Sequence, residues 1–393
     1  MSLLLAACII LLGACAETQA PTVIHLPDSA APGSAEPNLS RAADGTVVLS
    51  WLEPFGAGAA LRYSVLQQDA WSAPTTVASG DDWFVNWADF PSVVKIGQGL
   101  WAAHWLQKRP GGTYAYDVSI AFSQDDGRTW EDAITPHTDG TATEHGFVSL
   151  FPWQDGVGAL WLDGRNTADG GGMTLRSAVI DSDGRLTFEQ LADELVCDCC
   201  QTDVTVTPGG PVAVYRNRTV EEIRDIYVMR GDAGEWQPGR AIADDNWNIP
   251  GCPVNGPAIT SDGEDVAVAW FSAANNSPKV RFARSTDGGM SFGDAIDVAT
   301  TRAAGRVGVA LAPDGSAIVS WLRAGEDGKG EILVRLISPG GAAGKAHLIA
   351  TTDAGRMSGF PQLVRGQSGF VLAWTDTLQD RSIVRSALIS VID

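Results

Sequence analysis

Positive charge is scarce in this sequence. Only 27 of the 393 residues are Lys or Arg, against 47 Asp or Glu, so the formal net charge is −20. Charged residues of both signs make up 19% of the chain, below the usual ~25%. Proteins that bind nucleic acids neutralise phosphates with clustered Lys and Arg. The composition therefore excludes nucleic acid as a partner.

Long apolar runs and helical patterns are also lacking. Residues 3–14 form an apolar run of twelve, whereas a membrane-spanning helix needs about 20 such residues. No segment of ten or more residues keeps a 3.6-residue period between capping signals. These two absences exclude a membrane-spanning helix and a coiled coil.

Residues 3–14 have instead the length of a signal-peptide core. The segment Leu12-Gly13-Ala14-Cys15 resembles a bacterial lipobox, so we expect residues 1–14 to be a lipoprotein signal peptide and Cys15 to be lipidated. The alternative is an ordinary signal peptide that contains Cys15. The residue after Cys15 is Ala16. In known lipoproteins an Asp at this position favours retention at the inner membrane, so by resemblance Ala16 favours the outer membrane. We expect an exported protein held at the outer membrane by lipid alone, facing the periplasm or the cell surface.

One unit recurs along the whole chain. A Gly-containing turn is followed by an apolar strand that ends on an aromatic residue, as in DGTVVLSW and DGSAIVSW. Consecutive copies lie 51 to 56 residues apart. The seven aromatic positions are Trp51, Trp105, Trp161, Tyr215, Trp270, Trp321 and Trp374. A repeat of this length that fills the chain indicates a repeat architecture.

The apolar residues within each unit alternate with period two, which is typical of strands. Four short strands in each unit, repeated around an axis, describe a β-propeller. We therefore predict an all-β, seven-bladed propeller of four-stranded antiparallel blades over residues 15–393, a single domain and a monomer. A six-bladed ring is the alternative. Residues 21–26 resemble a fourth strand, which predicts that they complete the last blade and remove an exposed edge.

Two segments share a turn motif of the form S-x-D-x-G-x-T-W. Residues 123–130 match it as SQDDGRTW, and residues 285–292 match it as STDGGMSF. Asp accepts hydrogen bonds from amides of its own turn, and Gly permits positive φ. We predict a structural role for the motif residues, which are Asp125, Gly127, Trp130, Asp287, Gly289 and Phe292.

With these Asp boxes and its repeat, the chain resembles the sialidase superfamily of BNR-repeat propellers. The resemblance implies a propeller that carries its Asp boxes on the face away from a ligand site. Sialidases of this family grip a carboxylate with three Arg and use a Tyr–Glu pair and an Asp. The first Arg is absent here, because its place reads Ser34-Ala35-Glu36-Pro37-Asn38, and the last two units contain no Tyr. The chain therefore departs from authentic sialidases.

A propeller brings the segments that lead into each first strand, and the loops joining second to third strands, to one face around the channel. Polar groups that converge there form the default ligand site. The alternative is that they pair across blades. The expected ligand-binding residues on this face are Asp163, Arg165, Gln201, Arg216, Arg218, Asn255, Arg306 and Arg356. Candidate catalytic residues are Asp89, Glu144 and His145, with Asp89 and Glu144 as an acid and base pair.

Four cysteines follow the predicted signal segment, namely Cys197, Cys199, Cys200 and Cys252. An even number in an exported chain predicts two disulfides, with at least one between neighbouring blades. The alternative is a thiolate site for copper or zinc with His145 nearby. Because C-x-C-C with one distant Cys is not a standard zinc spacing, we expect no metal and no cofactor.

Three functions are compatible with these patterns. The first is an exported propeller that binds a glycan, another envelope component or a small molecule. The second is a glycoside hydrolase such as an exo-sialidase, which requires two carboxyl groups ~5 to 10 Å apart. The third is a scaffold in an envelope protein complex, which requires an exposed apolar patch beyond a few hundred Å².

Overall fold

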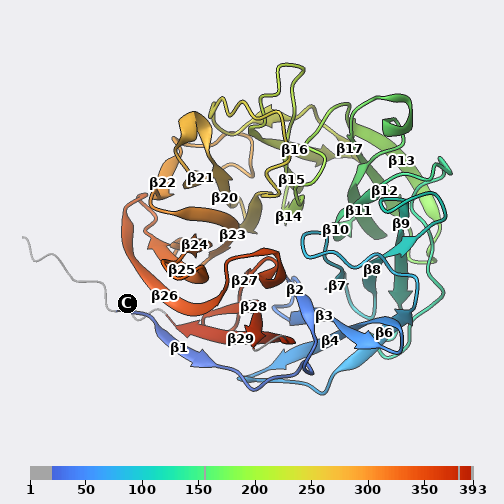
Figure 1. Ribbon diagram of the computed structural model, residues 1–393, viewed down its shortest axis with the longest axis horizontal. Helices are drawn as coiled ribbons and strands as arrows, with labels where there is room; N and C mark the ends of the chain where they lie inside the picture. Colours follow the sequence, from blue (N-terminus) through green and yellow to red (C-terminus); the bar gives the residue numbers. More distant parts are fainter. Residues whose placement is uncertain (1–19, 155, 379–380, 391–393) are drawn as a thin grey trace, which may run out of the picture.

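The computed structural model describes residues 20–154, 156–378 and 381–390. The predicted signal peptide and Cys15 lie outside these residues. The described residues form seven antiparallel sheets that follow one another around a ring (Figure 1). The prediction of a seven-bladed, all-β propeller is confirmed, and the six-bladed alternative is wrong.

The blades share one layout, in which strands follow one another outward from the centre. The innermost strands are β2 (Ala35–Arg41), β7 (Ser92–Lys95), β10 (His145–Trp153), β14 (Asp203–Thr207), β19 (Ala258–Asp262), β23 (Ala303–Leu311) and β27 (Gln362–Arg365). The second strands are β3 (Val47–Phe55), β8 (Trp101–Lys108), β11 (Gly156–Asp163), β15 (Gly210–Arg216), β20 (Asp265–Ser272), β24 (Ala317–Ala324) and β28 (Phe370–Leu378).

The two outer layers complete the blades. The third strands are β4 (Gly58–Gln67), β9 (Tyr116–Ser123), β12 (Thr174–Ile180), β16 (Ile226–Asp232), β21 (Lys279–Ser285), β25 (Lys329–Ile337) and β29 (Arg381–Ser390). The outermost strands are β6 (Thr75–Gly80), β13 (Leu186–Asp193), β17 (Glu235–Trp236), β18 (Arg240–Ala241), β22 (Ile296–Ala299), β26 (Ala343–Asp353) and β1 (Thr22–His25), and β5 (Ala70–Trp71) extends β4.

Blade 2 departs from this layout. Its sheet contains only β7, β8 and β9, and the place of a fourth strand is taken by one bridge between Ile120 and Ile134. Pro136 follows that bridge two residues later, and proline has no amide hydrogen with which to continue a ladder.

The repeated aromatic residues form the core between blades. All seven lie on second strands, and each is at most 8% exposed. The apolar clusters join successive blades: Trp270, for example, packs with Val212 and Val214 of the preceding blade. The period-two alternation therefore buries one wedge of apolar side chains at each blade interface.

The ring closes through its two ends. Strand β1 pairs antiparallel with β29, with Thr22 opposite Ser390 and His25 opposite Ala387. Figure 1 shows the blue first strand beside the red last blade. The prediction that an N-terminal strand completes the last blade is confirmed.

Three innermost strands carry the same irregularity near their start. The ladder register shifts next to Glu36 in β2, Phe147 in β10 and Arg306 in β23. These residues have φ of 51°, 54° and 52°, a region that non-glycine residues seldom adopt. Such bulges re-aim a side chain within a strand.

The first Asp-box turn lies directly after β9. Its Asp125 accepts hydrogen bonds from the amide and hydroxyl of Thr129 at 2.9 and 2.7 Å. Gly127 has φ of 79°, and its carbonyl accepts a 2.6 Å hydrogen bond from Tyr63 of the preceding blade. Trp130 contacts the same Tyr63 edge to face. The turn is thereby tied to the neighbouring blade.

The second Asp-box turn lies at the equivalent place after β21. Asp287 accepts a 2.8 Å hydrogen bond from the Ser291 amide, and Gly289 has φ of 80°. Arg240 of the preceding blade donates to the Gly289 carbonyl and lies over the Phe292 ring. Both turns therefore contact the third- or fourth-strand region of the blade before them.

Helix is almost absent from the described part of the chain. Its three 3₁₀ turns, η1 (Thr167–Asp169), η2 (Ala274–Asn276) and η3 (Arg356–Ser358), have three residues each. Among the residues described, none belongs to a helix with the length and hydropathy needed to cross a bilayer.

Candidate functional site

Three side chains from blades 2 and 3 meet where the chain enters β10. Tyr116 donates a 2.7 Å hydrogen bond to Oε1 of Glu144 and is 3.2 Å from Oδ2 of Asp89. Since one phenol oxygen contacts both carboxyl groups, those two carboxyl oxygens lie at most about 6 Å apart. We call Asp89, Tyr116 and Glu144 the carboxyl cluster.

Burial shapes the acid–base properties of this cluster. Asp89 is 3% exposed, and burial raises its pKa to about 8, although the Phe147 amide donates a 2.7 Å hydrogen bond to it. Burial also raises the pKa of Glu144, to about 7. Glu144 is only partly buried and therefore reaches the surface. At neutral pH the pair retains at least one proton, as an acid and base pair requires.

A row of aromatic rings leads from the surface to the carboxyl cluster. Tyr114 is 61% exposed and contacts Phe84 edge to face. Phe84 stacks on Tyr116, with ring centres 4.1 Å apart. Aromatic surfaces beside a few polar groups are typical of ligand sites.

A further perturbed carboxyl group lies in blade 1. Glu36 lies at the bulge of β2, and burial raises its pKa to about 7.

His145 belongs to a different group of side chains, although it follows Glu144 in sequence. Its ring is fully buried and stacks on His137, with centres 3.9 Å apart. The stacked pair lies between Asp117, Asp139 and Asp163, at nitrogen–oxygen distances of 3.1 to 3.8 Å. Burial lowers the pKa of His137 to about 4, so this ring is neutral at pH 7. His145 therefore faces away from the carboxyl cluster.

These imidazole and carboxylate groups are close enough to hold a metal ion. Two overlapping groups, Asp117–His137–His145 and Asp139–His145–Asp163, bring one ligand atom per residue within 4.8 Å. In the first group the two rings are stacked and parallel within 6°, so one ion cannot lie in both ring planes. In the second group Arg165 supplies a cation, since it contacts Asp163 at 2.7 Å and Asp139 at 3.4 Å. We call these imidazole and carboxylate groups with Arg165 the ion-pair cluster.

Asp163 and Arg165, two of the expected ligand-binding residues, thus lie in this ion-pair cluster. Asp163 is fully buried. The Arg165 side chain also contacts Glu189 at 2.8 Å. Their charges are satisfied within the blade.

Four more of the expected residues hold loops together at the hub. Arg216 is 1% exposed and donates to the backbone carbonyls of Arg224, Asn255 and Phe271. Arg306 is 8% exposed and donates to Ser358 and to the carbonyls of Gly355 and Gly359. Their N–H donors are therefore directed mainly to the protein's own backbone. Both residues thus behave as the alternative expects, with polar groups that pair across blades.

Gln201 and Asn255 are similarly occupied. The Gln201 amide donates to the carbonyl of Ala88 and accepts from the Gly256 amide. The Asn255 side-chain oxygen accepts a 2.8 Å hydrogen bond from the Arg306 amide. These contacts connect blades 2, 4, 5 and 6 across the hub.

Arg218 and Arg356 remain at the surface. Arg218 contacts Glu222 at 2.6 Å and Asp198 at 3.3 Å, with a quarter of its side chain exposed. Arg356 is exposed, and its guanidinium lies 5.9 Å from the Trp87 ring centre. Trp87 stacks in turn on Phe360. Of the eight expected ligand-binding residues, these two retain accessible charge.

The cysteines form one disulfide, between Cys199 of blade 4 and Cys252 of blade 5. The prediction of a cross-blade disulfide is confirmed. Cys197 and Cys200 are buried free thiols, so the prediction of two disulfides is wrong for this structure. His145 contacts the ion-pair cluster described above rather than the cysteines.

A cleft lies elsewhere on the ring. It has a volume of about 480 Å³ and is lined by residues of β1, β26, β28 and β29, including His25, Trp374 and Arg385. This place is the outer closure between blades 6 and 7. Burial raises the pKa of Asp376 in this cleft, but Arg385 contacts both Asp376 and Asp28 there. We favour the hub as the functional site, because one phenol there contacts two carboxyl groups whose pKa values are raised.

Sequence reasoning found Asp89 and Glu144 but missed Tyr116 and Glu36. Tyr116 begins a strand, and its hydrogen bonds to residues 27 and 28 positions away leave no local pattern. Glu36 lies in the segment Ser34–Asn38, and the sequence does not indicate that its carboxyl group is buried.

No protein-family model and no curated protein matches the chain. It is similar in structure to an α-L-arabinanase from Penicillium chrysogenum complexed with arabinobiose, at 14% identity over 94% of this chain and 99% of that chain, with a TM-score of 0.50. It is also similar to the endosialidase of phage phi92, at 8% identity over 95% of this chain and 70% of that chain, with a TM-score of 0.52. At such identities the likeness shows the fold alone, which is a β-propeller.

Proposed function

We propose that this protein binds a glycan at the hub, over the carboxyl cluster and its aromatic row. The observation that carries the proposal is the contact of Tyr116 with both Asp89 and Glu144 at the inner end of that row. Carboxyl oxygens accept hydrogen bonds from sugar hydroxyls, and exposed aromatic faces pack on apolar sugar faces. The propeller similar to this chain that was solved with arabinobiose supports a glycan as the ligand class.

A second candidate function is hydrolysis of a glycosidic bond at the same site. Retaining glycosidases place two carboxyl groups ~5 to 5.5 Å apart, and one of them must be protonated. Asp89 and Glu144 have carboxyl oxygens at most about 6 Å apart, which permits that separation, and the pKa of both is raised by burial. Glu144, which reaches the surface, is the candidate acid/base, and Tyr116 is the residue that positions it.

The scaffold alternative has less support. Each of the seven blades carries one or two of the exposed large apolar side chains among the described residues, from Phe55 in blade 1 to Met357 in blade 7. Spread over seven blades in this way, they do not mark one particular interaction surface.

Isothermal titration with arabinobiose and 3′-sialyllactose, followed by a wider oligosaccharide array, tests the binding proposal. We expect wild type to bind at least one glycan, and Glu144→Gln to weaken binding about tenfold or more. Glu264→Gln, an exposed residue of the β19–β20 turn, is the matched control and should bind like wild type. A wild-type protein that binds no glycan on the array, or a Glu144→Gln variant with unchanged affinity, overturns the proposal.

We further propose that the protein is exported and anchored through a lipid on Cys15. The cross-blade disulfide supports export, because disulfides persist in oxidising compartments. Mass spectrometry of the N-terminal peptide from membranes should find a lipidated Cys15. An unmodified Cys15 in a cytosolic protein contradicts this proposal.

A further inference from the structure

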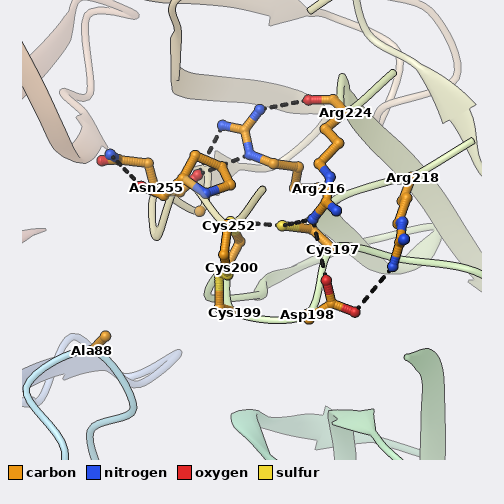
Figure 2. Close-up of a disulfide and its surroundings, with 12 residues drawn as sticks. Ala88, Cys197, Asp198, Cys199, Cys200, Arg216, Arg218, Arg224, Cys252 and Asn255 are labelled. Carbon is orange, nitrogen blue, oxygen red and sulfur yellow. Dashed lines mark hydrogen bonds and ion pairs between the residues drawn. A yellow bond between two sulfur atoms is a disulfide. The ribbon is translucent and has the colours of Figure 1, made fainter. Parts of the chain in front are cut away.

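Four sulfur atoms meet where blades 4 and 5 begin. Cys197, Cys199 and Cys200 lie in the segment leading into β14, and Cys252 lies in the segment leading into β19. Cys199 and Cys252 are joined as a disulfide with Cα atoms 6.1 Å apart. The free Cys197 and Cys200 bring their sulfur atoms to 3.2 Å of each other (Figure 2).

Cys197 has the surroundings of a reactive thiol. A hydrogen bond from Cys200 lowers the pKa of Cys197 to about 6, and the charges of Arg216 and Arg224 add to this effect. The Arg224 guanidinium lies 3.3 Å from its sulfur (Figure 2). Burial raises the pKa of Cys200 well above its usual value. At neutral pH, Cys197 is therefore a thiolate and Cys200 a thiol, the division of roles found in C-x-x-C redox pairs.

A disulfide that this thiolate can attack lies beside it. The sulfur atoms of Cys197, Cys199 and Cys252 all lie within 4.8 Å of one another. Cys252 is exposed, whereas Cys197 and Cys200 are buried. Attack on the sulfur of Cys252 yields a Cys197–Cys252 bond, while attack on Cys199 would close a strained ring of three residues. Cys252 is therefore the favoured target.

We propose that Cys197 and Cys200 are a redox-active dithiol that exchanges with the Cys199–Cys252 disulfide. The Cys197 thiolate attacks Cys252, the Cys199–Cys252 bond breaks, and Cys199 leaves as a thiolate. Cys200 then loses its proton and attacks Cys197, which releases Cys252. Cys197 and Cys200 are oxidised to a disulfide, Cys199 and Cys252 are reduced, and the one proton lost by Cys200 is taken up by the released pair, which ends as one thiolate and one thiol. No external oxidant is needed.

The exchange changes what the crosslink holds. The Cys199–Cys252 bond joins two blades across 53 residues of sequence, whereas a Cys197–Cys200 bond lies within one segment. After exchange, the segment around Cys252 is no longer tied to blade 4. Two thiols remain in either form, so thiol counting alone does not distinguish the two forms.

Disulfide mapping of the purified full chain tests the proposal. The protein is incubated without reductant at pH 7, quenched in acid, alkylated with N-ethylmaleimide after denaturation and digested for mass spectrometry. We expect both Cys199–Cys252 and Cys197–Cys200 peptides, the second in about a tenth or more of the molecules. When a protein that carries only the Cys199–Cys252 disulfide is incubated at each pH, the exchange should be about tenfold slower at pH 5 than at pH 7. The reason is that most of the Cys197 thiolate is protonated at pH 5.

Cys200→Ser removes the second attacking thiol and is expected to trap the Cys197–Cys252 disulfide. Cys197→Ser removes the first attacking thiol, and this variant should contain only the Cys199–Cys252 disulfide. Two results overturn the proposal. One is that Cys199–Cys252 is the sole disulfide found, both in wild type at every pH and in the Cys200→Ser variant. The other is a protein isolated with four free thiols and one equivalent of zinc or copper, which would show a metal site instead.

Discussion

Burial keeps protons on the hub carboxyl groups at a pH where ordinary carboxyl groups are charged. The pKa of Glu144 is raised to about 7 in the folded protein, and an unfolded chain has the usual value near 4.5. Below the unfolded value both states are protonated, and the shift has no effect. As pH rises toward 7 the unfolded state loses its proton first, so this group makes the folded state less stable.

Glu144→Gln should remove that pH dependence while still accepting the hydrogen bond from Tyr116. Relative to wild type, we expect the variant to gain about 1 kcal/mol in unfolding free energy between pH 5 and pH 8, after allowance for its partial exposure. Urea denaturation at the two pH values measures the difference. A stability difference between variant and wild type that is the same at both pH values would show that the carboxyl group titrates normally.

The fate of single polar residues was the least predictable part of the site. The sequence pattern placed Arg216 and Arg306 on the hub correctly, but their partners are backbone carbonyls of other blades. Carbonyls are present at every residue, so the sequence gives no sign of which ones will accept. Glu144 and His145 show the same limit, because adjacent side chains face opposite sides of a strand.

Among the elements, the Asp-box turns are held mainly by hydrogen bonds of one side chain. The hydroxyl of Ser285, with the amide and hydroxyl of Ser291, lowers the pKa of Asp287 to about 2. The stabilisation that these bonds provide is present above the usual carboxyl pKa near 4 and is lost as pH falls toward 2.

Asp287→Ala should lower the melting temperature by about 1 to 3 °C at pH 7, since it leaves exposed amide and hydroxyl groups without their acceptor. The loss should vanish near pH 2. Affinity for a hub ligand should stay at the wild-type level. Calorimetry at both pH values and a titration measure these effects, and a loss of affinity at full stability would contradict the structural role.

Strand positions were predictable wherever the period-two pattern and turn residues agree. Residues 60–66, 117–122 and 280–283, which lie about ten residues after the aromatic position of their unit, belong to the third strands β4, β9 and β21. The fourth strand of blade 2 was harder to predict. The segment after Ile134 does not continue the ladder, and its His137 and Asp139 lie in the ion-pair cluster instead. The sequence shows Pro136 there, but not the ionic partners that compensate for the missing ladder.

At the scale of the whole molecule, ring closure depends on a strand of four residues. Strand β1 covers the edge of β29, and the Leu26 amide extends the pairing with a 3.0 Å hydrogen bond to the Ser386 carbonyl. Leu26 is itself buried in the core shared by blades 1 and 7.

A chain beginning at Pro27 should therefore melt at least about 5 °C below a control chain beginning at Ala20. Its uncovered β29 edge should also promote association that increases with concentration. Thermal unfolding and analytical ultracentrifugation of both chains measure these effects. A shortened chain that stays monomeric and equally stable would show that β1 does not close the ring.

The architecture as a whole was predictable because its signal is repeated seven times. Aromatic residues at near-constant spacing indicate where each second strand lies, although every one of these strands continues beyond its aromatic residue. An error in one unit is corrected by the other units. The cysteine pairing had no such redundancy. Three connectivities were compatible with the spacing, and only the positions of the two neighbouring segments decide among them.

The bulges at Glu36, Phe147 and Arg306 have an evolutionary consequence. An acid, an aromatic residue and a base occupy the three places with nearly the same φ, so the backbone shape does not depend on the chemistry of the side chain. The residue at such a place can therefore change during evolution while the surrounding blades keep their shape.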